Sequence, residues 1–101
     1  MKHTIPEDTR ELFRAILTLR SEEECAAFFE DICTIKEIQD LSQRLQVAAM
    51  LNQGEKYQTI EQSTGASTAT ISRVNKCLLY GSGGYRTVLE RCFETEGKEQ
   101  K

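Results

Sequence analysis

The chain has 101 residues, of which 39% are hydrophobic and 29% charged, and its formal net charge is -3. This length gives room for one domain, 1–101, and a single proline with charges spread throughout argues against a disordered protein. No apolar run approaches membrane length and the N-terminus lacks a signal-peptide core, so we expect a cytoplasmic protein without a membrane partner.

Apolar residues at helical spacing predict three helices in the first half of the chain. Pro6 suits the first turn of a helix that runs to about residue 19. Capping boxes open the next two helices, Ser21 with Glu24 and Thr34 with Glu37. The third helix runs to about residue 53, and its apolar band is so broad that it needs partners on more than one side: Ile35, Ile38, Leu41, Leu45, Val47, Ala48, Met50 and Leu51.

Four cysteines occur in a chain without an export signal, and we expect them to be reduced. No pair has the short spacing of a zinc knuckle and the only histidine is His3, so we expect no metal site. Cys25 and Cys33 fall on apolar faces, where cysteine behaves as a small hydrophobe. We expect both to be buried, and the alternative is a redox switch.

The segment 57–79 predicts a helix, a glycine turn and a second helix, which is the layout of a DNA-reading helix-turn-helix. Ile60 would face inward on the first helix, and Gly65 supplies a positive-φ turn residue. The second helix has inward residues at helical spacing: Ile71, Val74 and Leu78. Its outward residues can cap the helix and contact phosphates or base edges: Ser67, Thr68, Thr70, Ser72, Arg73 and Lys76.

Two positions depart from the usual helix-turn-helix pattern. Glu61 stands where such motifs have a small apolar residue, and Thr64 where they have a larger one. The alternative to DNA binding is therefore a plain helical hairpin joined at a glycine C-cap.

Charge is distributed unevenly along the chain. Residues 1–39 hold five basic and nine acidic side chains, a net of -4, whereas residues 40–80 hold four basic and three acidic, a net of +1. Acidity thus lies away from the proposed reading head, and we expect few phosphate contacts and modest affinity from a monomer.

Glycines at 81, 83 and 84 predict a linker before a last helix at 85–93. A phosphate cradle is the alternative, but the segment lacks the strand and lysine of a P-loop. Six helices and no alternating pattern make the fold class all α. The apolar helices of 1–53 are too short to close a core, so we expect them to interleave in a twofold homodimer that presents two reading heads.

Two segments, SQRLQVAAMLNQGEKY and TGASTATISRVNKCL, resemble the tryptophan repressor (TrpR) superfamily, and more closely its repressor-related, YerC/YecD-like branch from Gram-positive bacteria. The resemblance covers most of the chain. It implies a six-helix TrpR-like fold, an intertwined helical homodimer, and a reading head whose tilt is set by an amino-acid corepressor.

The resemblance also implies a corepressor site between the long helix and the reading helix. Arg44 and Arg73 match arginines that hold the ligand, and Thr34 and Thr70 match threonines near the ligand or the operator. Guanidinium groups bind carboxylates bidentately and stack on planar rings. The alternative is that Arg44 pairs with a carboxylate of its own helix and Arg73 contacts phosphate.

Two residues of this site differ from the tryptophan-binding members. Val74 replaces a glycine that makes room for the indole, and Cys77 replaces a hydroxyl residue near the ligand's amino group. Added volume in a tight pocket costs about 1–3 kcal/mol. We therefore expect a smaller planar amino acid, such as histidine, or no ligand, rather than tryptophan.

Together these features predict a transcriptional regulator, a repressor of an amino-acid metabolism operon that binds a double-stranded DNA operator. We expect no enzymatic activity and no cofactor, since no candidate groups for acid-base or nucleophilic catalysis come together. The alternative is a helical protein-interaction module that binds neither DNA nor ligand, which salt dependence would separate from a DNA-binding protein.

Overall fold

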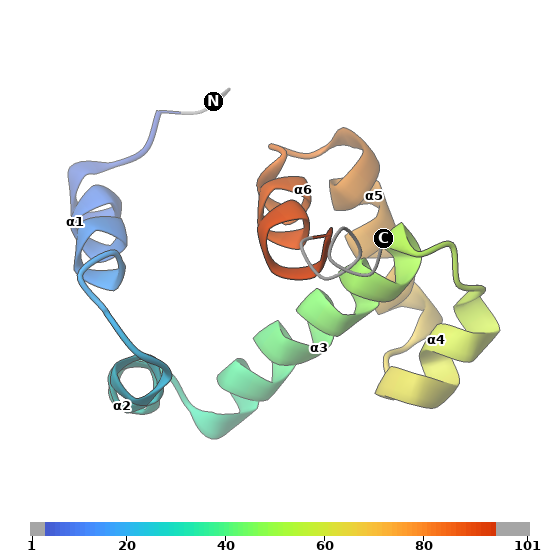
Figure 1. Cartoon of the computed structure of the whole chain (residues 1–101), viewed down its shortest axis with the longest axis horizontal. Helices are drawn as coiled ribbons and strands as arrows, with labels where there is room; N and C mark the ends of the chain where they lie inside the picture. The colour runs from blue at the N-terminus through green and yellow to red at the C-terminus, as the bar shows by residue number, and fades with distance from the viewer. Residues whose placement is uncertain (1–3, 95–101) are drawn as a thin grey trace. The chain divides into compact units, whose positions relative to one another are not determined.

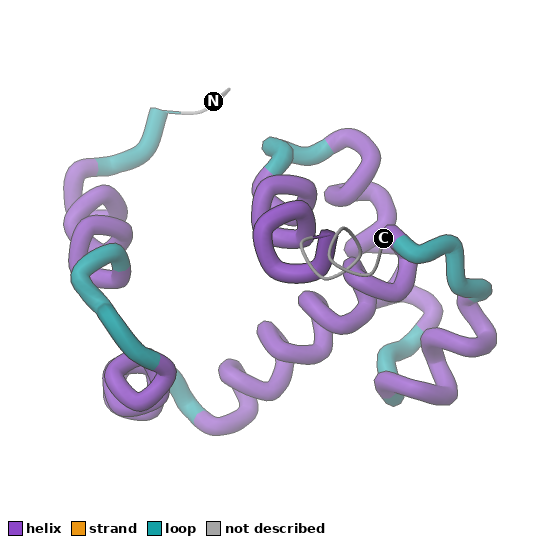
Figure 2. The backbone as a smooth tube through the Cα atoms, viewed as in Figure 1, coloured by secondary structure: helices purple, strands orange, loops and turns teal. Residues whose placement is uncertain are grey.

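The computed structural model describes residues 4–94, and every regular element in this range is a helix (Figures 1 and 2). The elements are α1 (Glu7–Ile16), α2 (Glu22–Ile32), α3 (Ile35–Asn52), α4 (Tyr57–Thr64), α5 (Thr68–Tyr80), α6 (Gly84–Leu89) and the π-helical segment η1 (Glu90–Glu94). The predicted all-α class with six helices is confirmed. None of these helices is long and apolar enough to cross a membrane. His3 lies outside the described residues.

The chain divides into two compact units, Met1–Gln39 and Asp40–Lys101, and α3 runs through the division. The first unit contains α1, α2 and the first turn of α3. The second contains the rest of α3 and all later elements. The candidate interface lies entirely in the second unit.

Both predicted caps form in the first unit, but only the Thr34–Glu37 pair makes both hydrogen bonds of a capping box. Ser21 accepts a hydrogen bond from the Glu24 N–H at 3.1 Å, and the Glu24 carboxylate accepts one from the Arg20 N–H at 2.8 Å. At the start of α3, the Glu37 N–H donates to the Thr34 hydroxyl and the Thr34 N–H donates to the Glu37 carboxylate. These bonds satisfy N–H groups that a helix leaves unpaired, which explains where α2 and α3 begin.

Helices α1 and α2 bury none of their residues. Leu17 is 81% exposed and Ile32 is 53% exposed, although both are large and apolar. The prediction that Cys25 and Cys33 are buried is wrong, because Cys25 is exposed and Cys33 is only partly buried. The apolar pattern of α2 is real, but two short helices provide too few layers to cover it.

The core belongs to the second unit. Figure 1 shows α4, α5 and α6 gathered around the C-terminal part of α3. Each contributes to one cluster of buried side chains: Val47, Ala48, Ile60, Ala66, Ile71, Val74, Leu78 and Leu89. The predicted inward residues of the helix-turn-helix are therefore confirmed. On α3, the broad apolar band is covered only in part, since Leu41 and Leu45 remain exposed.

The chain changes direction after α5 at Gly81. The Gly81 N–H donates to the Cys77 carbonyl at 2.8 Å, and a Cβ at position 81 would collide with that same carbonyl. Glycine is therefore required here for space. The last helix lies where the sequence predicts it, but after Leu89 it continues as a π-helix, a difference that apolar spacing does not reveal.

Candidate nucleic-acid interface

Helices α4 and α5 are joined by a three-residue turn that begins at Gly65. This glycine has φ 75° and ψ 3°, the left-handed conformation, and its N–H donates to the Glu61 carbonyl at 2.9 Å. The predicted positive-φ turn is confirmed. Ala66 then enters the core, which fixes the second helix of the pair against the first.

Thr64 fits the turn although its position usually holds a larger apolar residue. Its hydroxyl donates to the Ile60 carbonyl at 2.7 Å and accepts from the Ala66 N–H at 3.1 Å. The Gln43 side chain of α3 donates to the Thr64 carbonyl at 3.1 Å. The polar atoms of this partly buried residue are thereby satisfied. A threonine at this position is therefore compatible with the helix-turn-helix geometry.

Ser67 is the N-cap of α5. Its side-chain oxygen accepts from the Thr70 N–H at 3.1 Å, and its hydroxyl also donates to the Thr70 hydroxyl oxygen at 3.1 Å. This arrangement satisfies one unpaired N–H of the first turn, as the sequence predicts for a serine at a helix start.

The two sides of α5 differ in burial. Ile71, Val74 and Leu78 lie in the core. Thr70 is partly buried, while the other residues predicted to contact DNA are all exposed: Ser67, Thr68, Ser72, Arg73 and Lys76. The structure thus brings the hydroxyls and both cations to the solvent side of one helix, whose other side is fixed to the core.

A contact that the sequence analysis missed links α4 to α5. The Thr68 hydroxyl donates to the Glu61 carboxylate at 2.9 Å, and both residues are exposed. Glu61 was notable in the sequence only as a departure from the usual pattern. A pair seven residues apart across a turn leaves no periodic signal, so the contact becomes visible only in the structure.

The residues predicted to bind a ligand differ in burial and in the unit to which they belong. Thr34 belongs to the first unit and caps α3. Val74 is only 2% exposed, whereas Arg44, Arg73 and Cys77 are exposed. The Val74 side chain belongs to the buried core cluster.

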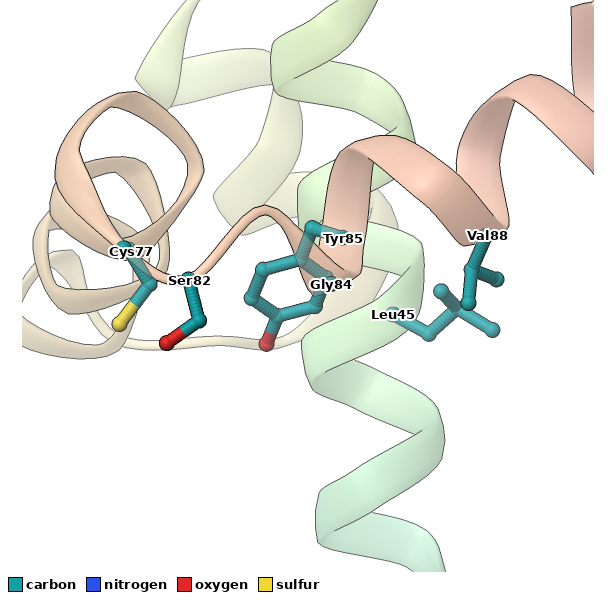
Figure 3. A pocket seen from close by; sticks show the side chains of 7 residues that line it. Leu45, Cys77, Ser82, Gly84, Tyr85 and Val88 are labelled. Atoms are coloured by element: carbon teal, nitrogen blue, oxygen red, sulfur yellow. The ribbon is translucent and has the colours of Figure 1, made fainter. Parts of the chain in front are cut away.

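An open pocket of about 630 Å³ lies between α3, α5 and α6 (Figure 3). The Cys77 sulfur and the hydroxyls of Ser82 and Tyr85 point to the same side of it in the view. The lining is mainly apolar: Leu45, Cys77, Gly81, Ser82, Gly84, Tyr85 and Val88. Cys77 is the one predicted ligand residue in this lining.

Among the described residues, Tyr85 is the titratable side chain whose pKa is most clearly shifted by its environment. Burial raises the pKa of its hydroxyl above the ordinary value of 10.0, the nearby Cys77 thiol raises that pKa further, and the positive charge of Arg44 lowers it. Arg44 therefore acts electrostatically on the pocket even though its side chain is not part of the lining.

Comparison with known proteins gives consistent matches over nearly the whole described chain. The family described as Trp repressor protein matches residues 7–93. The uncharacterized protein YerC of Bacillus subtilis strain 168 is 58% identical over 86 residues, which cover 85% of this chain and 83% of that protein.

Two solved structures are also similar. A candidate Trp repressor from Staphylococcus aureus has a TM-score of 0.83 and 57% identity, covering 86% of this chain and 87% of its own. A TrpR-like protein from Eubacterium eligens has a TM-score of 0.83 and 53% identity, covering 85% and 89%. The predicted resemblance in sequence and fold is therefore confirmed.

Proposed function

The chain belongs to the Trp repressor family, and we propose that it is a sequence-specific DNA-binding transcriptional regulator that acts in the cytoplasm. The family consists of DNA-binding regulators rather than enzymes. The observation that carries the proposal is the two-sided burial of α5, whose apolar side joins the core while its hydroxyls and cations face solvent. A helix fixed in this way can enter a major groove as a rigid element.

The residues of α5 divide into two groups in this proposal. Those of the first turn, Ser67, Thr68 and Thr70, contact base edges or phosphates, since the start of a reading helix approaches the bases. Arg73 and Lys76 contact the phosphate backbone, together with Ser72. With few cations per chain, the affinity of one reading head is modest, and a second head doubles the contacts.

We further propose that the chain acts as a homodimer, with 1–53 for dimerisation, 57–79 for reading DNA and 85–93 as the C-terminal helix, all within one functional domain. The exposed apolar residues of the first unit support this organisation, for example Leu17 and Ile35, which are 81% and 75% exposed. Apolar surface of this kind is stabilised when a second copy covers it.

The finer part of the proposal is a repressor of an amino-acid metabolism operon with an amino-acid corepressor. The ligand would be held by Arg44 and Arg73, with Thr34, Val74 and Cys77 beside it. The buried side chain of Val74 supports a ligand smaller than tryptophan. Thermal shifts measured with all twenty amino acids test this part, and selective stabilisation by tryptophan would contradict the size argument.

The DNA-binding proposal is tested by replacing both cations of α5, Arg73→Ala and Lys76→Ala together. We expect loss of binding to duplexes enriched in genomic binding profiling of the tagged protein, and a steep fall of wild-type affinity with salt. Arg86→Ala is a control, since Arg86 is an exposed cation of α6 that lies outside the proposed dimerisation and reading segments. Equal DNA affinity of the double variant and the wild type, or no enriched duplex at all, would contradict the proposal.

A protein-interaction module is the second candidate, and the exposed apolar residues of α1 and α2 favour it. In that case the double variant of α5 forms the same protein assembly as the wild type. An apolar protein interface also changes little with salt, so the same titration separates the two functions.

A further inference from the structure

The hydrogen bond between Glu61 and Thr68 lies on the outer surface of the helix-turn-helix. Its length is 2.9 Å between the Thr68 hydroxyl and a Glu61 carboxylate oxygen, and both residues are exposed. The two side chains meet because the left-handed Gly65 reverses the chain between them. The core packing of α4 and α5 therefore holds this pair in place without burying it.

The pair presents one kind of hydrogen-bonding group to solvent. A carboxylate only accepts hydrogen bonds, and a threonine hydroxyl has a single proton to donate. Because Thr68 donates that proton to Glu61, the lone pairs of both side chains remain free to accept. The result is a pair of acceptors with a negative charge.

The pair also lies at the N-terminal end of the proposed reading helix, the end that contacts base edges. Thr68 is the first residue of α5, whereas Arg73 and Lys76 come one to two turns later. Residues at the start of a reading helix contact base edges, and cations farther along contact phosphates. A carboxylate near a helix start is also stabilised by the helix dipole, so a purely structural role is the competing explanation.

We infer that the Glu61–Thr68 pair is a specificity determinant of the reading head and selects a base amino group in the major groove, either cytosine N4 or adenine N6. This inference rests on the proposed DNA-binding function. Amino groups are the donors that the major groove offers, whereas guanine O6 and N7 and thymine O4 are acceptors that the pair disfavours. The negative charge also repels the phosphates of every duplex, and only a duplex with the matching donor offsets this repulsion.

The test begins with the sequence that the wild-type protein selects from a randomised duplex DNA library. Affinities are then measured for that duplex and for duplexes with each base pair changed, using the wild type, Glu61→Gln and Thr68→Val. Glutamine keeps the shape of Glu61 but adds donors, and valine keeps the shape of Thr68 without its hydroxyl. Glu90→Gln is the control, because it removes the same charge from an exposed residue of η1.

We expect Glu61→Gln to reduce discrimination at one base pair by about tenfold or more and to tighten binding to the mismatched duplexes. Thr68→Val should reduce discrimination at the same base pair, and Glu90→Gln should leave it unchanged. The base pair affected identifies the donor as cytosine or adenine.

Three other results overturn the inference. If Glu61→Gln and Thr68→Val have the same base preference as the wild type, the pair is not a specificity determinant, and the proposed function remains intact. A uniform fall in affinity for all duplexes, with a lower melting temperature, assigns the pair a structural role. If the wild type selects no sequence, the proposed function itself fails and the inference falls with it.

Discussion

The two units of the chain contain equally regular helices but differ completely in burial. Helices α1 and α2 have a proline start, a serine N-cap and apolar side chains, and yet they bury no residue. In the second unit, α4 and α5 are of similar length and contribute half of the core cluster. Helix formation is thus local, whereas a core needs several neighbouring elements that close on one another.

The same contrast appears within the single helix α3. Ile35 at its start is 75% exposed, and Val47 near its end is fully buried. Both residues belong to one continuous apolar band in the sequence. The band by itself therefore does not reveal which part is covered in this chain and which part remains exposed.

The largest expected effect comes from truncating the core of the second unit. Ile71→Ala removes a fully buried side chain and should lower the free energy of unfolding by about 2–5 kcal/mol. Urea denaturation followed by circular dichroism measures the change. Leu79→Ala, at a residue of the same helix that is 51% exposed, is the control and should have a much smaller effect. Similar losses for the two variants would break the contrast between core and surface.

Truncation in the first unit should act on association instead. Leu17→Ala removes an apolar side chain that is 81% exposed in the single chain and that a dimer would cover. We expect dimerisation to weaken by about 1.5–3 kcal/mol if the residue becomes fully buried. Sedimentation equilibrium over a range of protein concentrations measures the dissociation constant. An unchanged constant would exclude the Leu17 side chain from the subunit contact.

The two serine N-caps make equivalent hydrogen bonds in different units and allow a direct comparison. Ser67→Ala should lower the free energy of unfolding of the second unit by about 1 kcal/mol, because it leaves an N–H of α5 unpaired. Ser21→Ala removes the corresponding bond of α2. We expect chemical denaturation that is monitored in the second unit to show a lower stability for Ser67→Ala and no change for Ser21→Ala. Equal responses would mean that the units unfold together.

The smallest effect concerns Tyr85 and alkaline pH. Burial raises its pKa, so the folded chain holds the hydroxyl proton more tightly than the unfolded chain. The stabilisation is fully present below the unfolded pKa, near 10.0, and is lost as pH rises through the folded pKa. The free energy of unfolding of the wild type, compared with Tyr85→Phe, should decline above about pH 10. A constant difference between the two proteins across this range would argue against the effect.

The candidate interface was predictable where its signals are local. Gly65 follows from the need for a left-handed residue, and Ser67 from the chemistry of a helix start. Glu61 and Thr68 were visible in the sequence as separate residues only. Their contact depends on the angle at which two helices leave the turn, and core packing sets that angle. The pocket beside Tyr85 likewise combines three helices that no single stretch of sequence brings together.

By itself, the sequence determined the class, the order of the helices, the turn at Gly65 and the inward residues of α5, because periodicity and capping act over a few residues. Only the tertiary structure decided that Cys25 is exposed and Val47 is buried, and that Glu61 meets Thr68. Burial depends on which other elements lie opposite a side chain. Similar apolar patterns are therefore buried in one unit and exposed in the other.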